Sequence, residues 1–136
     1  DEGRLSAEED ARRERQRTSP LRGILDYEFS GDGSALLFPR GGDLYHYDLK
    51  APATRASRRL TNTPSAETDP RFSPRGRYVS WVREQDLYAY DLRAGAERRL
   101  TTDGGGTISN GVAEFVAQEE MGRTTGYWWS PDESRI

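Results

Sequence analysis

The sequence contains no cysteine and only one histidine, His46. Without cysteine there are no disulfide bonds and no thiolate metal sites, and the redox compartment stays open. A structural zinc site or a histidine-based catalytic triad would have to depend on the single imidazole of His46. We therefore expect neither a metal site nor a cofactor in this chain.

The sequence also has little excess of charge of either sign and no long apolar run. The 20 basic residues nearly balance the 23 acidic ones, and the pI is near 5.3, so nucleic acid is not the expected partner. No run approaches the roughly 18 apolar residues of a membrane-spanning helix, so no membrane span is expected. No apolar segment near residue 1 has the form of a signal peptide, so the signal of an exported protein would have been removed or left out.

Hydrophobic residues make up only 33% of the sequence, which raises the question of whether the chain folds. Chains that stay unfolded usually combine low hydrophobicity with high net charge and few aromatic residues. Here the net charge is only −3, and seven Tyr and three Trp supply additional apolar area. The composition therefore favours a folded domain.

Residues 1–19 are expected to form a charged helical leader. Ser6 and Glu9 have the spacing of a capping box, in which each side chain bonds a free N–H group at the start of a helix. We predict a short polar helix over residues 7–17, which ends before Pro20. A frayed, solvated leader is the alternative.

From residue 20 onward the sequence repeats itself. The segment 29–33 (Phe-Ser-Gly-Asp-Gly) is echoed by 72–76 (Phe-Ser-Pro-Arg-Gly) and by 129–133 (Trp-Ser-Pro-Asp-Glu). The segment 43–49 is echoed by 86–92, again 43 residues later. A period of 40–50 residues with about four strands per repeat is typical of the blades of a β-propeller.

Each repeat predicts short strands between turn residues. Residues 78–82 are rich in β-branched and aromatic side chains, and residues 86–92 alternate between two faces. An outer strand is predicted at residues 98–101. The corresponding strands of the first repeat are predicted at residues 35–38, 44–49 and 59–61.

These observations predict an all-β fold, a partial β-propeller over residues 20–136. It should contain about two blades and the start of a third, with a short helix inserted near residues 112–121. Propellers typically need four to eight blades to close their ring. We therefore interpret the chain as a fragment of a longer protein, truncated before the remaining blades; an open two-blade module is the alternative.

The third repeat begins late, because Trp129 follows Phe72 by 57 residues instead of 43. Insertions in repeat arrays fall in loops, often on the binding face, and a link between blades runs over one face toward the central channel. The helix expected in this insertion should pack through four apolar side chains, Val112, Phe115, Val116 and Met121.

Glu119 and Glu120 fall at the C-terminal end of that helix. This is the unfavourable end for acids, because the helix dipole there favours cations. One interpretation is a clamp in which both carboxylates accept hydrogen bonds from the three N–H donors of an ammonium group. The alternative is a pair of solvated surface acids.

Several segments resemble dipeptidyl peptidase IV. Residues 110–111 (Asn-Gly), 114–116 (Glu-Phe-Val), 119–120 (Glu-Glu) and 128–132 (Trp-Trp-Ser-Pro-Asp) are similar to the double-Glu segment of that family. Residues 13–17, 23–27 and 36–39 resemble the start of its bacterial members. The likeness covers nearly the whole chain, and its most specific part is the double-Glu segment with the Trp-Trp-Ser-Pro that follows.

The resemblance implies an eight-bladed propeller that caps an α/β-hydrolase domain. The implied activity is that of a serine peptidase that removes N-terminal dipeptides with Pro or Ala at the second position. Glu119 and Glu120 fall on the positions that bind the free α-amino group of the peptide substrate, which places the second peptide bond at the catalytic serine. The family also binds the substrate carbonyl through a propeller arginine. Arg40 and Arg123 are the candidates for it, with a solvated surface arginine as the alternative for each.

The sequence also departs from that family. It contains no Gly-x-Ser-x-Gly elbow, which carries the nucleophile, and His46 lies in a repeated strand whose second copy has Ala89. We therefore expect this chain alone to lack the catalytic Ser, Asp and His and to be inactive, with the C-terminal hydrolase domain of the parent chain as its partner. The resemblance is compatible with a homodimeric parent and a periplasmic or secreted location, while a cytoplasmic location stays open.

Two other functions remain as alternatives. One is a non-enzymatic propeller module that binds a protein, as periplasmic propellers of the TolB kind do. The other is a different hydrolase of the prolyl oligopeptidase family, such as an acylaminoacyl peptidase. The Glu pair favours the dipeptidyl peptidase over the latter, because a blocked N-terminus has no ammonium group to bind.

Overall fold

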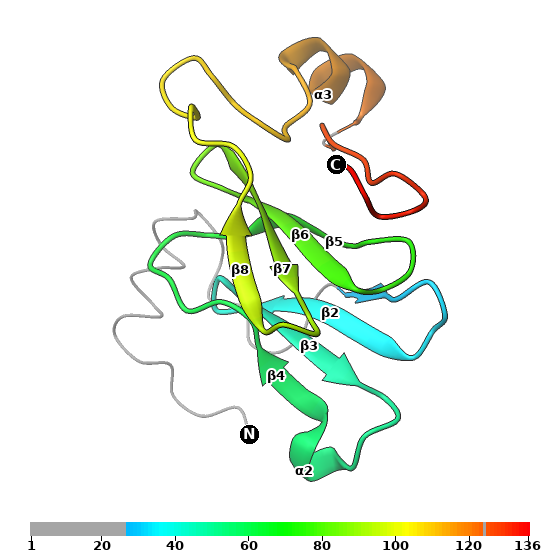
Figure 1. Ribbon diagram of the computed structural model, residues 1–136. Helices are drawn as coiled ribbons and strands as arrows, with labels where there is room; N and C mark the ends of the chain where they lie inside the picture. The colour runs from blue at the N-terminus through cyan, green and yellow to red at the C-terminus, as the bar shows by residue number, and fades with distance from the viewer. Residues whose placement is uncertain (1–26, 124) are drawn as a thin grey trace.

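The computed structural model describes residues 27–123 and 125–136, which form mainly two four-stranded antiparallel sheets (Figure 1). The fold is mostly β, as the sequence predicts, and each sheet corresponds to one propeller blade. The helical leader predicted within residues 1–19 lies outside the described residues.

Within each sheet, every strand pairs with the next one along the chain. The first sheet contains β1 (Glu28–Phe29), β2 (Ala35–Arg40), β3 (Asp43–Asp48) and β4 (Ser57–Arg59). The second contains β5 (Thr68–Phe72), β6 (Tyr78–Arg83), β7 (Asp86–Asp91) and β8 (Ala96–Arg99). A single helical turn that the sequence did not predict, α2 (Ala53–Ala56), connects β3 to β4.

The strands predicted at residues 35–38, 44–49, 78–82 and 86–92 are confirmed to within two residues, but both outer strands begin and end earlier than predicted. The early end of each outer strand is explained by a threonine hydroxyl that replaces a backbone partner in the ladder. Leu44 N donates to the hydroxyl of Thr61, and Leu87 N donates to the hydroxyl of Thr101, each at 2.9 Å. Leu60 N and Leu100 N still donate to the carbonyl oxygens of Leu44 and Leu87 at 2.8 Å, so each hydroxyl replaces one bond of the next ladder pair. As a result, β4 and β8 end at the arginine two residues before each threonine.

The aromatic-Ser turn has the same geometry in all three repeats. Ser30 N, Ser73 N and Ser130 N each donate to the carbonyl oxygen five residues later at 2.9 Å. Each serine hydroxyl in turn accepts from the backbone N–H of that same later residue, at 2.9–3.0 Å. Residues 130–135 therefore fold as the start of a third blade, as the sequence predicts.

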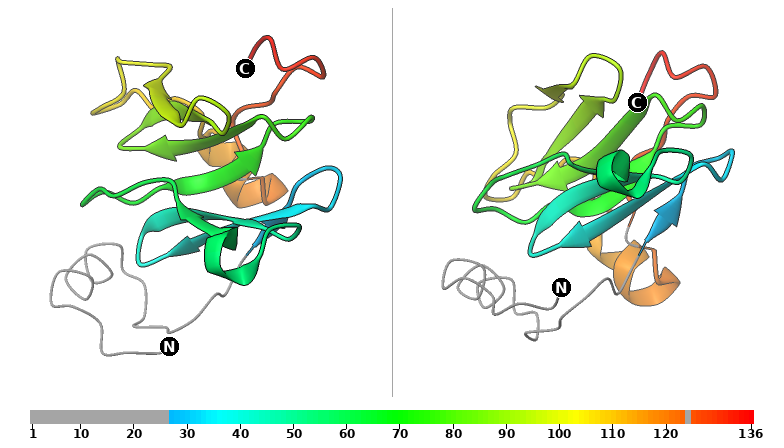
Figure 2. Two further views of the ribbon diagram at one scale, coloured as in Figure 1. Left: turned by 60° about the horizontal axis from the view of Figure 1, so that its bottom comes forward. Right: turned by 90° about the horizontal axis from the view of Figure 1, so that it is seen from below.

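The main core lies between the two sheets, which are stacked on one another in both views of Figure 2. Leu37 and Leu44 enter it from the first sheet, and Val79 and Trp81 enter it from the second. All four are at most 1% exposed. Fully burying a side chain of this kind stabilises a fold by about 1.5–3 kcal/mol, so the contact between the sheets is a main source of stability.

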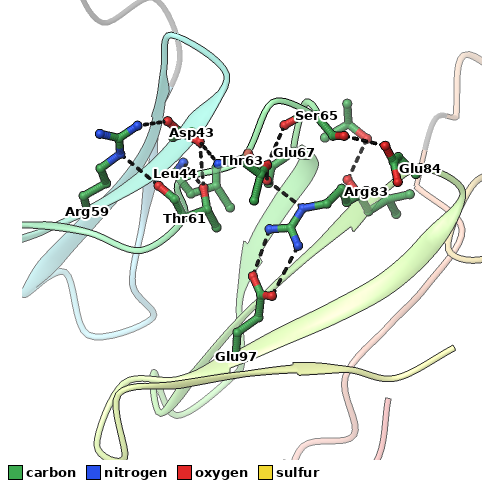
Figure 3. A network of polar contacts seen from close by, with 12 residues as sticks. Asp43, Leu44, Arg59, Thr61, Thr63, Ser65, Glu67, Arg83, Glu84 and Glu97 are labelled. Carbon is green, nitrogen blue, oxygen red and sulfur yellow. Dashed lines mark hydrogen bonds and ion pairs between the residues drawn. The ribbon is translucent and has the colours of Figure 1, made fainter. Parts of the chain in front are cut away.

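A chain of polar contacts also joins the sheets (Figure 3). Arg83 of β6 donates to Glu67 at 2.8 Å and forms two hydrogen bonds, at 2.8 and 3.2 Å, with Glu97 of β8. Thr63 donates through its hydroxyl to Glu67 at 2.8 Å and through its backbone N–H to Asp43 at 3.1 Å. Burial raises the pKa of Glu67, while the hydrogen bonds from Thr63 and Arg83 oppose that shift. The linker between the sheets is therefore fixed at both ends.

The position of the core predicts that two leucines five residues apart contribute very differently to stability. Leu44 is fully buried, whereas Leu49 is 47% exposed. Leu44→Ala should lower the free energy of unfolding by about 2–5 kcal/mol because it leaves a cavity between the sheets, and Leu49→Ala should change it by less than about 0.5 kcal/mol. Urea denaturation of the two variants measures both values. Equal effects would contradict the assignment of the core.

Candidate functional site

The insertion contains one helix, α3 (Phe115–Met121). The side chain of Glu114 caps it by accepting from the backbone N–H groups of Val116 and Ala117 at 3.2 and 3.1 Å. The helix ends at Gly122, whose φ of 62° is the left-handed conformation that glycine adopts without strain. The predicted helix began at residue 112; α3 begins three residues later because the backbone of Glu114 is extended and its side chain acts as the cap.

The predicted packing side of this helix is wrong. Phe115 is 74% exposed and Met121 is 71% exposed, and the side chains of Val112 and Val116 are exposed as well. The buried residue of α3 is Ala117, at 1%, and Ala113 just before the helix is buried at 4%. The buried positions are therefore two alanines four residues apart, and the large apolar side chains are exposed.

Glu119 and Glu120 lie in the last turn of α3, and both side chains are exposed. That turn carries no basic residue. The free carbonyl groups at the end of a helix add partial negative charge. The two carboxylates therefore lie where a cation is attracted, and their binding of a substrate amine stays a prediction.

The two candidate arginines lie in different surroundings. Arg40 is the last residue of β2 and is exposed. Arg123 follows the glycine cap of α3, and its guanidinium lies 5.7 Å from the centre of the exposed Trp128 ring, a cation–π arrangement. A carbonyl-binding role for either one stays a prediction.

A pocket of about 480 Å³ lies between the insertion and the inner strands β1 and β5. Gln118, which precedes Glu119, lines it from α3, and Pro39, which precedes Arg40, lines it from β2. The neighbours of two predicted binding residues therefore share one pocket. Other lining residues are Glu28, Leu37, Asp69, Val82 and Gly111.

The chain leading into the insertion is fixed by the carboxylate of Asp86, the first residue of β7. Asp86 is 1% exposed and forms an ion pair with Arg99. Its Oδ1 accepts from the Thr101 hydroxyl at 2.6 Å and from Gly104 N and Asn110 Nδ2 at 3.0 Å each. We call this arrangement the Asp86 clasp. The hydrogen bond from the Thr101 hydroxyl, followed by that from Arg99, holds the pKa of Asp86 well below its usual range.

The first sheet contains the same arrangement around Asp43, also 1% exposed. Asp43 forms an ion pair with Arg59 and accepts from the Thr61 hydroxyl and from Thr63 N. The repeat of residues 43–49 at 86–92 was recognised from the sequence, but no role was predicted for the aspartate that begins each segment. The sequence does contain a signal for this arrangement, because an aspartate, an arginine and a threonine recur at equivalent places in both repeats.

The chain leaving the insertion is fixed to β5. The Tyr127 hydroxyl donates to the carbonyl oxygen of Asp69 at 2.6 Å and accepts from the Ser80 hydroxyl at 3.2 Å. The Thr125 hydroxyl bonds to Arg71 and to the Asp69 carboxylate. Asp69 has a φ of 49° at a bulge in β5, which turns its carbonyl away from the strand ladder. Nothing in the sequence pattern predicted this contact.

His46 lies in the middle of β3, with its ring 6.0 Å from that of Phe72 in an edge-on arrangement. Within residues 27–123 and 125–136, no group of three His, Cys, Asp or Glu is placed to hold a metal ion. None of the helices in that part of the chain is both long and apolar enough to cross a membrane.

Comparison with known proteins identifies the family. The family model for the N-terminal region of dipeptidyl peptidase IV (DPP IV) matches residues 30–136. The chain belongs to the dipeptidyl peptidase IV family. The matched region contains strands β2 to β8, the insertion with the Glu pair, and the start of the third blade.

Individual members of the dipeptidyl peptidase group are similar to the chain at about 30% identity. Dipeptidyl peptidase 8 of Mus musculus is 31% identical over 99% of this chain, and that of Homo sapiens is 31% identical over 96%. The crystal structure of Porphyromonas gingivalis dipeptidyl peptidase 4 covers 86% of the chain at 29% identity, with a TM-score of 0.70. The chain spans only 16–18% of the length of these three relatives.

The single histidine of the sequence, His46, leads to a prediction of how stability depends on pH. Burial, followed by the charge of Arg58, lowers the pKa of His46 below its ordinary value of 6.5. The unfolded chain then binds a proton at a higher pH than the folded chain. Stability should therefore fall as the pH is lowered from about 6.5 through the folded-state pKa of His46. Replacement by glutamine should remove this part of the pH dependence, and an NMR titration of the imidazole should give a pKa below 6.5; a value above 6.5 would contradict the account.

Proposed function

We propose that this chain is the propeller part of an exo-acting serine peptidase that removes X-Pro or X-Ala dipeptides from the N-terminus of peptides. In this proposal Glu119 and Glu120 bind the free α-amino group of the substrate. The observation that supports it is that both carboxylates are exposed together at the negative end of a helix that has no basic residue in its last turn. Membership of the dipeptidyl peptidase IV family supports it further.

The chemistry follows from the two charged groups. An α-ammonium group has three N–H donors, and two adjacent carboxylates offer acceptors and a compensating charge. Holding the amine at a fixed point sets the distance along the peptide to the bond that is cut. Binding energy from the amine thereby positions the second peptide bond at the nucleophile, which accounts for removal of two residues at a time.

The substrate carbonyl needs a second contact, for which Arg40 and Arg123 remain the candidates. Arg40 is the last residue of β2, and Pro39, the residue before it, lines the pocket beside α3. Arg123 is stacked on Trp128, which limits the directions its guanidinium can face. Neither arginine is among the described residues that line this pocket, so both remain candidates.

The remaining parts of the reaction belong to the rest of the parent protein. We propose that a C-terminal α/β-hydrolase domain supplies the catalytic Ser, Asp and His, and that residues 20–136 contribute blades to its propeller. A homodimeric parent and a periplasmic or secreted location are part of the same proposal.

The Glu pair is tested in the full-length parent protein. Glu119→Gln and Glu120→Gln should each lower kcat/KM for free-amine X-Pro reporters by tenfold or more, about 1.4 kcal/mol, because each removes a charge that faces the ammonium group. Glu114→Gln is the control for charge, since it makes the same charge change at the other end of α3 and keeps one of the two side-chain oxygens that accept the cap hydrogen bonds. Near wild-type rates in both Glu-pair variants would refute the proposed clamp.

A second experiment concerns the isolated 136-residue chain. It should hydrolyse no X-Pro reporter, because the proposed catalytic groups belong to the hydrolase domain. The measurement is a reporter assay across several concentrations of the repurified chain. Activity that rises in proportion to this polypeptide would contradict the division of labour between propeller and hydrolase domain.

A further inference from the structure

The helix that carries the Glu pair is held mainly through the segments before and after it. Its own burial is limited to small side chains, with Ala117 as its buried residue, while Phe115 and Met121 are more than two-thirds exposed. Such a helix has little packing of its own to fix its position. Its placement must come from the two flanking segments, which we call the entry stem (residues 103–112) and the exit stem (residues 125–129).

The entry stem is fixed at Asn110. Its amide donates to Asp86 at 3.0 Å and to Asp103 at 2.9 Å, so one side chain joins the Asp86 clasp to the start of the insertion. Its backbone N–H donates to the carbonyl oxygen of Gln85 at 2.8 Å. Because Asp86 is buried and ion-paired with Arg99, the point to which Asn110 is bound is rigid.

The exit stem is fixed at Tyr127, which is 5% exposed and packs with Val82 and Leu87. Its hydroxyl bridges the carbonyl of Asp69 and the hydroxyl of Ser80, as described above. Burial raises the pKa of this phenol above its usual range, so it stays a neutral donor at all physiological pH values.

The two stems are also bound to each other. Val112 and Thr125 form an isolated β-bridge, and Gly126 N donates to the carbonyl oxygen of Gly111 at 3.2 Å. A side chain at Gly126 would overlap the backbone of Val112, which shows how closely the stems approach. The base of the insertion is therefore one unit, and a shift of either stem displaces α3 with it.

From this geometry we propose that Asn110 and Tyr127 are positioning residues for substrate binding, which act by fixing where Glu119 and Glu120 lie. Neither touches the substrate in this account. The inference rests on the proposed function of the Glu pair. It predicts that weakening a stem damages amine recognition specifically, because misplacing a binding group by about 1 Å can reduce a rate by up to about a hundredfold.

The test uses Asn110→Ala in the full-length protein, with Asn62→Ala as the matched control. Asn62 accepts from Arg59 at 2.9 Å, so it contacts the equivalent clasp in the first sheet, from which the chain continues directly to β5. Asn110→Ala should lower kcat/KM for a free-amine X-Pro reporter about five- to twentyfold, and Asn62→Ala should change it less than about twofold. Tyr127→Phe, which removes only a hydroxyl, should also lower this kcat/KM. It replaces Asn110→Ala in the test if that variant does not fold.

Two further readouts separate positioning from general damage. The rate of inactivation by an organophosphonate ester that lacks an amine should stay within about twofold of wild type in both stem variants. In a double variant, Asn110→Ala should add less than about twofold to the loss already caused by Glu120→Gln, because both act on the same interaction. Equal loss towards the organophosphonate, or fully multiplicative losses in the double variant, would overturn the proposal.

The outcomes also distinguish this inference from the proposed function. If the Glu-pair variants lose activity while Asn110→Ala and Tyr127→Phe retain it, the stems do not position the pair and only the present inference fails. If Glu119→Gln and Glu120→Gln are themselves as active as wild type, the proposed function fails and this inference fails with it.

Discussion

A single buried carboxylate at the start of the third strand organises each blade of this chain. Asp43 and Asp86 are almost completely inaccessible to water, which is costly for a charged group unless it is paired and hydrogen-bonded. Each is paired with an arginine of the outer strand and bonded to the threonine that follows. Removing one partner from such a buried arrangement leaves an uncompensated charge, so the outer strand, its threonine and the linker beyond are all constrained by one carboxylate.

In the second blade this buried carboxylate also fixes the insertion that carries the proposed binding residues. There the clasp also binds Asn110 of the insertion, and a bulge in β5 of the same sheet exposes the carbonyl of Asp69 to Tyr127. Two rigid points on the blades thus define where the insertion begins and ends. The helix between them can expose its acids and its large apolar residues because its placement does not depend on burying them. This is the usual division between a rigid scaffold and a functional loop.

Features that depend on sequence patterns were predicted well, whereas features that depend on contacts between distant residues were not. The strands were predictable because alternation is a local pattern and the 43-residue repeat is visible in the sequence itself. The third aromatic-Ser turn folds like the first two. The outer strands were misplaced because the hydroxyls of Thr61 and Thr101 replace backbone partners. The predicted packing side of α3 was wrong because the spacing of the large apolar residues did not reveal that Ala113 and Ala117 are the buried positions. The contact of Tyr127 with Asp69 spans 58 residues and depends on a positive φ, which no local pattern shows.

The central claim is that Glu119 and Glu120 together bind the amine of the substrate. The most direct test is a crystal structure of the full-length protein with an N-terminally free X-Pro ligand bound. The account predicts that the ligand nitrogen lies about 2.7–3.2 Å from a carboxylate oxygen of each residue, with the helix in the position described here. A ligand whose amine faces solvent, or contacts other residues while both carboxylates stay unbound, would contradict it.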